Sequence, residues 1–308
     1  MLSPGLVFEL TLVGIALGAL YSLAALGIVL IYKTTGVLNF AHGAIGMFST
    51  FIAFQFGVQM GWPAPIAILL ALAFAAAFGW FMERFTLRPL RERAVLTRVI
   101  VTLGWLLILQ AVASLIWRDT SYHVPLQIFP QDGVRLGQLT LGYNQIANIV
   151  IGAALAVLLG LFLKLSPLGV AMRATSDNPQ AARLLGIKVD RVAAASWVLG
   201  SLLAAIAGLL LAPLTTLNTT ELTIIVIQAF GAALIGGLTN LTLTFVGGLA
   251  LGVAQSLLPL LLNAFFGVPL ALSGTKDALT FAVILAVLLL RREVRVLAIS
   301  AAGGGEAL

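Results

Sequence analysis

The chain has 308 residues, of which only 9% are charged and 61% are hydrophobic. A soluble domain carries about 25% charged residues, so this composition excludes an ordinary soluble fold. The net charge of +6 comes from a few short segments rather than from one basic surface, which excludes a nucleic-acid-binding protein, and the absence of cysteine excludes disulfides and thiol chemistry.

Long uncharged segments predict the membrane spans, because a helix needs about 20 apolar residues to cross a bilayer. Turn signals at Gly61–Pro65 and Thr239–Thr242 divide the two longest segments. The sequence therefore predicts an all-α polytopic bundle of about nine spans, with eight to ten allowed, in which the segment after Leu222 is either a span or a re-entrant helix. In chain order the expected spans are 10–32, 36–60, 65–82, 99–117, 136–163, 192–220, 222–238, 243–262 and 271–290.

Lysine and arginine are distributed unequally between the expected loops. If the spans alternate in direction, 14 of the 17 basic residues fall on one side, and the positive-inside tendency makes that side cytoplasmic. The N-terminus is then outside and the C-terminus cytoplasmic. We expect one transmembrane domain over 1–297, with a cytoplasmic segment over 166–191, and a short flexible tail over 298–308. The acidic residues Glu9, Glu221 and Asp277 are expected near the outer boundary.

Two pairs of glycines have the spacing that lets membrane helices approach closely. Gly14 and Gly18 form one pair, and Gly248 and Gly252 form the other. The alternative interpretation is the general glycine enrichment of membrane proteins. The sequence alone leaves both open.

The interior of the expected bundle is neutral and polar rather than charged, with His42 as the one clear ionisable residue. Asn39 and His42 are three residues apart and share a helix face, where both must find partners in a medium without water. Together with Gly43 they predict a polar patch that lines a translocation path or steadies a gate, or else a structural hydrogen bond. Gln228 is a further buried amide that fits either role.

Sequence signals of catalysis are missing. No phosphate-binding glycine loop precedes a lysine, so we expect no ATP hydrolysis by this chain. His42 and His123 each lack a second ligand at helical spacing, so we expect no metal site, and we expect His123 to be solvated. The chain is therefore predicted not to be an enzyme.

The expected cytoplasmic segment contains a short helix between two strong signals. Asn178 is predicted as its N-cap, Pro179 as its first residue and Gly186 as its terminator, which leaves about two turns. Its exposed small and apolar side chains suit docking into a groove on a soluble partner, which would pass movement to the spans. The alternative is an interfacial helix that lies on lipid headgroups.

Several motifs, in the same order along the chain, resemble those of the permeases of branched-chain amino-acid ABC importers. They are Gly18–Gly27, Leu38–Gly43, the segment from Met172 to Ile187, Ile235–Leu238 and Lys276–Ala278, so the resemblance covers nearly the whole chain. It implies a translocation subunit that pairs with a second homologous permease, two ATP-binding subunits and a periplasmic or extracellular solute-binding protein. ATP and Mg²⁺ would be bound by those partners, with no cofactor in this chain.

The resemblance also implies roles for individual residues. The translocation path would include Asn39, His42, Gly43, Gln228, Gly236 and Gly237. The residues expected to couple to the ATPase are Arg173, Asn178, Pro179, Gln180, Ala181, Ala182, Arg183, Leu184, Leu185 and Gly186.

The sequence thus favours a multi-pass permease of the bacterial inner membrane that carries branched-chain amino acids or related small zwitterions and amides. A channel or facilitator that works without partners fits the neutral interior equally well. A membrane enzyme would need a catalytic constellation that His42, Asn39 and the boundary carboxylates do not supply.

Overall fold

The computed structural model describes residues 4–118, 130, 132–136, 139–215, 217–266 and 275–290. Within these ranges the chain is mostly helical. The helices are α1 (Pro4–Thr35), α2 (His42–Phe54), α3 (Ala64–Phe81), α4 (Val95–Trp117), α5 (Tyr143–Leu165), α6 (Pro167–Asp177), α7 (Pro179–Leu184), α8 (Val189–Leu211), α9 (Thr219–Ile235), α10 (Leu241–Phe266) and α11 (Thr275–Leu290). Two π-helical turns, η1 (Gln55–Gln59) and η2 (Met82–Leu87), and one 3₁₀ turn, η3 (Ala212–Leu214), continue α2, α3 and α8.

Six helical segments of the described chain are long and apolar enough to cross a bilayer. They are Pro4–Thr35, Ala64–Leu87, Val95–Trp117, Tyr143–Leu165, Val189–Leu214 and Leu241–Phe265. The predicted helical membrane bundle is therefore confirmed, but the predicted number of nine spans is not. The other three expected spans correspond to shorter elements, namely α2 with η1, α9 and α11.

The one sheet of the described residues is a small antiparallel hairpin of β1 (Gly133–Leu136) and β2 (Leu139–Gly142), in which Gly133 pairs with Gly142. The sequence analysis assigns residues 136–142 to a span, whereas the structure starts α5 only at Tyr143. Apolar and polar residues alternate along both strands, which is the period of a strand rather than of a helix. Only β2 lies inside the long uncharged segment that begins at residue 136, so that segment hides the strand pattern there.

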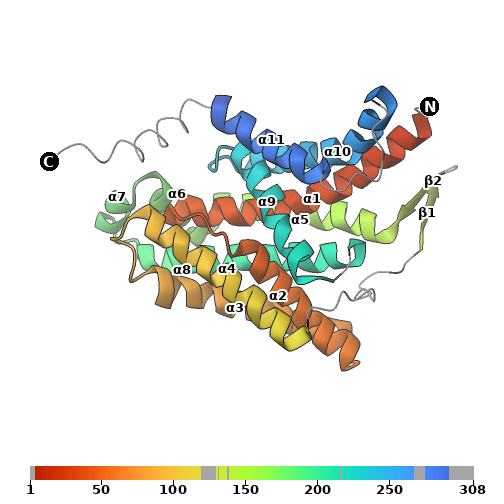
Figure 1. Cartoon of the computed structure of the whole chain (residues 1–308). Coiled ribbons are helices and arrows are strands. Elements are labelled where there is room, and N and C mark those ends of the chain that lie inside the picture. Colours follow the sequence, from red (N-terminus) through yellow and green to blue (C-terminus); the bar gives the residue numbers. More distant parts are fainter. Residues whose placement is uncertain are drawn as a thin grey trace.

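Helix α1 is the centre of the bundle. Its residues are buried almost continuously from Gly14 to Ile31, as expected for a helix that is apolar on every side. Other helices surround α1 along its length, while the hairpin lies near its N-terminal end and α6 and α7 lie at the opposite end (Figure 1). The bundle therefore has two distinct ends.

The predicted glycine pairs meet each other across the interface between α1 and α10. A Cβ atom on Gly14 would lie 2.6 Å from the Val253 Cα, and one on Gly18 would lie 2.7 Å from the Leu249 Cα, so the two backbones are in contact. The Ser22 hydroxyl also donates a 2.7 Å hydrogen bond to the Phe245 carbonyl oxygen. Close helix packing is thus the correct interpretation of these glycines, and it fixes α10 antiparallel to α1.

We expect Gly18→Ala to destabilise the protein, because the added methyl group would collide with backbone atoms that cannot rotate away. The cost of such overpacking is about 2 kcal/mol. The matched control is Gly160→Ala in α5, where no atom lies within 4 Å of the added Cβ and alanine favours the helix by up to about 1 kcal/mol. Thermal unfolding of the purified variants in detergent measures both. Equal melting temperatures for the two variants would contradict the α1–α10 contact.

Helix α9 crosses between two groups of helices. Its N-terminal half packs on α2, where a Cβ added to Gly43 would clash with the backbone of Thr223. Its C-terminal half packs on α10 and α11, where Gly231 faces Leu251 and Thr280. In Figure 1, α9 accordingly runs across the bundle rather than along α1. This placement joins segments that are far apart in the sequence.

The π-helical turn η2 ends α3 with one residue more per turn than an α-helix. The Arg88 backbone N–H donates to the Glu83 carbonyl oxygen at 2.8 Å, five residues back. Glu83 is buried, although the neighbouring Arg84 and Phe85 are exposed. The wider turn therefore directs one carboxylate into the protein at the same end of the bundle as α6 and α7.

Candidate functional site

Helix α7 is held by the caps that the sequence predicts. The Asn178 Oδ1 accepts hydrogen bonds from the backbone N–H groups of Gln180 at 3.0 Å and Ala181 at 2.9 Å. Pro179 is the first helical residue, and Gly186 follows the helix with a φ of +82°, a conformation that favours glycine. A sharply delimited helix of about two turns therefore lies at the α6 end of the bundle.

The side chains of α7 are unequal in exposure. Leu184 is 90% exposed and Leu185 is 80% exposed, whereas Ala182 is only 2% exposed. The sequence analysis treats all three as docking residues, but Ala182 packs within the protein and holds α7 in place. The other predicted coupling residues, Arg173, Asn178, Pro179, Gln180, Ala181, Arg183 and Gly186, are exposed. Two leucines on the surface expose apolar area that only a partner or a membrane surface can cover.

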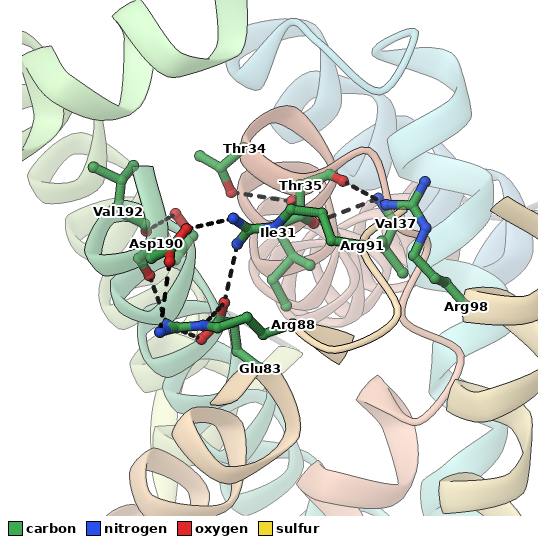
Figure 2. A network of polar contacts seen from close by, with 11 residues as sticks. Ile31, Thr34, Thr35, Val37, Glu83, Arg88, Arg91, Arg98, Asp190 and Val192 are labelled. Atoms are coloured by element: carbon green, nitrogen blue, oxygen red, sulfur yellow. Dashed lines mark hydrogen bonds and ion pairs between the residues drawn. The ribbon is translucent and has the colours of Figure 1, made fainter. Parts of the chain in front are cut away.

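An ion-pair network fixes the start of α8, which follows α7 directly. Glu83, whose side chain is 3% exposed, accepts two hydrogen bonds from Arg88, at 2.6 and 3.1 Å, and one from Arg91 at 3.3 Å. Arg91 also donates to the Asp190 carboxylate, and Arg88 donates to the Asp190 carbonyl oxygen at 3.0 Å. Figure 2 shows both arginines reaching from the segment after α3 toward Asp190.

The geometry of this network makes it an electrostatic link between two parts of the chain. The Glu83 hydrogen bonds raise the pKa of Arg88, so its guanidinium group remains charged. Paired guanidinium and carboxylate groups with this burial are strongly ordered because a lone buried charge is costly. The network therefore ties the end of α3 to the start of α8. Beside it, Arg98 of α4 donates to the Thr35 carbonyl oxygen at 3.3 Å and so joins α4 to the end of α1 (Figure 2).

A cavity of about 1070 Å³ opens beside this network and α7. It is lined by the end of α1, the segment after α3, parts of α6 and α7, the start of α8 and the turn before α10. The lining residues include Lys33, Arg88, Arg91, Glu92, Arg183 and Asp190. The short helix therefore lies at the rim of a recess lined by charged residues.

The predicted polar patch lies deep in the bundle. Asn39 and His42 are 0% and 1% exposed; the Asn39 amide has no hydrogen-bond partner among the described residues, and the backbone of Ala24 in α1 is a polar neighbour of the His42 ring. His42 packs so closely against α1 and α8 that a Cβ on Gly27 would lie 2.7 Å from its ring. Thr102 of α4 fixes the preceding loop by accepting from the Phe40 backbone N–H at 3.2 Å.

The remaining predicted pathway residues lie at two different places, one along α9 and the other just after its C-terminal end. Gly43 contacts the N-terminal half of α9 and Gln228 follows in its middle. Gly236 and Gly237 instead form the turn from α9 to α10, where Gly237 has a φ of +68° and Gly236 packs against Thr244. The structure therefore brings Asn39, His42 and Gly43 together and separates the glycine pair from them.

The structure gives Asp277 a partner that the sequence does not predict. It is expected near the outer boundary, and its Oδ1 accepts a 3.2 Å hydrogen bond from the Gln228 Nε2 in the middle of α9. Asp277 lies in the first turn of α11 and is half-buried. Glu83 is a second functional residue that the sequence analysis does not name. Its spacing of five residues from Arg88, at the end of an expected span, is a signal that could have identified it. His123 and the tail over 298–308 lie outside the described residues.

Comparisons with known proteins agree with this architecture. The family described as "Branched-chain amino acid transport system / permease component" matches residues 10–288. The chain is 30% identical over 295 residues to the high-affinity branched-chain amino acid transport system permease protein LivH of Escherichia coli (strain K12), covering 90% of this chain and 91% of that one.

Two further relatives mark the breadth of the similarity. The permease protein BraD of the high-affinity branched-chain amino acid transport system of Pseudomonas aeruginosa is 32% identical, with 90% of this chain and 92% of that protein covered. The fructose import permease protein FrcC of Rhizobium meliloti is 27% identical, with coverages of 86% and 73%. A family match over nearly the whole helical bundle, together with relatives of almost equal length, means that this multi-pass membrane protein belongs to the family of branched-chain amino-acid transport permeases.

Proposed function

We propose that this chain is the translocation subunit of an ATP-driven importer, and that α7 couples it to a separate ATPase. The observation that carries the proposal is the rigid, capped α7 with Leu184 and Leu185 exposed beside a charged recess. A short rod of this kind fits a groove on a soluble partner. A lipid-bound helix would instead need a longer apolar face.

The proposal includes an orientation and a set of partners. The end of the bundle with α6, α7 and the arginines faces the cytoplasm, because basic loops stay on that side, and the N-terminus lies outside. Counting the chain at α2 with η1, at α9 and at α11 as three further crossings gives the nine spans that this orientation requires, although helix α11 itself covers only part of the bilayer. The partners are two ATP-binding subunits, a second homologous permease and a solute-binding protein, with membrane lipid around the bundle. ATP and Mg²⁺ are bound by the ATPases, and this chain is not an enzyme.

The translocation path follows the polar interior. Asn39 and His42 lie beside Gly43, where α2 contacts α9, and Gln228 continues the polar line along α9. Buried polar atoms without partners are costly in a bilayer, so they favour a role in which another conformation exposes them to a solute. Gly236 and Gly237 act at the turn beside the cavity, where they allow α9 and α10 to move together.

The cargo is a branched-chain amino acid or a related small zwitterion or amide, carried across the bacterial inner membrane. The LivH and BraD relatives, whose names state branched-chain amino acid transport, support this assignment, as does the neutral interior. FrcC, named for fructose import, indicates that the same architecture serves other small polar solutes.

Reconstitution into liposomes tests the proposed function. The chain alone is expected neither to hydrolyse ATP nor to pass labelled leucine, whereas the complex with its permease partner, ATPases and binding protein takes up leucine only with ATP on the side of α7. The matched control is the same complex with ATP on the opposite side. Leucine flux through the chain alone would instead identify a channel or facilitator and refute the proposal.

A further inference from the structure

Three polar residues from three different helices meet inside the bundle. The Gln228 Nε2 of α9 donates to the Asp277 Oδ1 of α11 at 3.2 Å, and the Tyr21 hydroxyl of α1 lies within electrostatic range of the same carboxylate. Tyr21 and Gln228 are 8% and 6% exposed, and Asp277 is half-buried. We call Tyr21, Gln228 and Asp277 the mid-bundle cluster.

The mid-bundle cluster is far from both ends of the bundle. Tyr21 lies 17 residues after the start of α1 and 14 before its end, which at ~1.5 Å per residue is about 26 Å and about 21 Å. The hydrocarbon core of a bilayer is about 30 Å thick, so the Asp277 carboxylate lies within the membrane. Figure 1 agrees, since α11 runs only from the middle of the bundle toward the end that carries α6.

The cluster offers acceptors on the side that faces away from the internal hydrogen bond. A carboxylate only accepts, so the Gln228 amide must turn its nitrogen toward Asp277, which turns its Oε1 away. That Oε1 is buried and has no hydrogen-bond partner among the described residues. The cluster therefore contains two acceptors, the Asp277 carboxylate and the Gln228 Oε1, and the second of them has no donor among the described residues.

A carboxylate at this depth is costly unless a cation or several donors approach it. An ammonium group supplies a positive charge and three donors, and aromatic rings such as that of Tyr21 attract it as well. Amino acids carry this group, whereas ketoacids and sugars do not. The chemistry of the cluster therefore suits the ammonium group of a zwitterionic solute.

We propose that Asp277, Gln228 and Tyr21 form a transient binding site for the ammonium group of the amino acid as it passes through the permease. The inference rests on the proposed function and names a site within it. The site lies on the same helix as the contact with Gly43, so α9 links it to the buried Asn39 and His42. The solute would therefore move along α9 between the two polar regions.

The test uses the complete complex, with leucine as the probe and loaded binding protein in excess. Asp277→Asn keeps an oxygen that accepts from Gln228 but removes the charge, so leucine transported per ATP hydrolysed is expected to fall at least ~10-fold. Asp277→Glu, which keeps the charge, should restore part of this ratio. The control is Glu9→Gln, which removes an exposed carboxylate near the start of α1 and should leave the ratio unchanged.

The outcomes separate the two proposals. If the wild-type complex transports no leucine, the proposed function fails. If the wild-type complex transports leucine and Asp277→Asn matches it, the ammonium site is overturned. If Asp277→Asn does not assemble, Gln228→Met decides, because it removes the second acceptor together with the donor to Asp277 while the carboxylate stays in place: a reduced ratio of leucine to ATP supports the site, and an unchanged ratio overturns it.

Discussion

Leu184→Glu is expected to reduce ATP-driven uptake by at least ~10-fold without changing the amount of protein in the membrane. The side chain is 90% exposed in the isolated chain, so the substitution leaves the fold intact. Under the proposed coupling the same side chain enters a groove on the ATPase, where losing a buried leucine costs about 2 kcal/mol and burying a carboxylate costs more. Uptake and ATP hydrolysis of the complex measure the effect.

The matched control is Leu290→Glu. Leu290 is 82% exposed and ends α11 at the end of the bundle that carries α6, so it tests whether any acidic residue on this surface interferes (Figure 1). Its uptake should stay near the wild-type rate. Equal losses in the two variants, or normal uptake in Leu184→Glu, would rule out docking through α7. Ala182 is unsuitable as a probe because its burial makes any bulky substitution disrupt α7 itself.

Arg88→Met is expected to lower the stability of the protein by about 3 kcal/mol, because it leaves the Glu83 carboxylate buried with one long contact to Arg91 in place of three hydrogen bonds. Thermal unfolding in detergent should show a melting temperature several degrees below that of the wild type. The same change should weaken coupling, since Arg88 also holds the Asp190 carbonyl oxygen at the start of α8.

Two comparisons separate this network from a general charge effect. Arg84→Met removes the same charge from an exposed neighbour and should have little effect on stability. Glu83→Gln keeps the acceptor oxygen and leaves two arginines that are partly exposed and can reach water, so it should cost less than Arg88→Met. Identical melting temperatures for Arg84→Met and Arg88→Met would refute the role of the network.

The local features of this protein could be predicted from the sequence, and α7 is the clearest case. An N-cap asparagine, a proline at the first helical position and a terminating glycine each act within three or four residues, so the pattern contains the whole interaction. The glycine pairs of α1 and α10 were also predictable as close contacts, although their pairing with each other came only from the structure.

The features that depend on distant parts of the chain could not be predicted in the same way. Glu83 and Asp190 are 107 positions apart and are joined by arginines whose contacts with Asp190 no local pattern specifies. The contact of Asp277 with Gln228 could not be predicted because it joins two helices whose residues lie 49 positions apart.

The wide turn at the end of α3 makes chain length there as decisive as residue identity. Each residue of a helix advances the direction of the side chain by about 100°, so a deletion of one residue within η2 would swing Arg88 away from the acid that it holds. The length of η2 therefore sets the directions of the side chains that follow it, including that of Arg88. A relative one residue shorter at this point would need other contacts to hold the end of the bundle that carries α7.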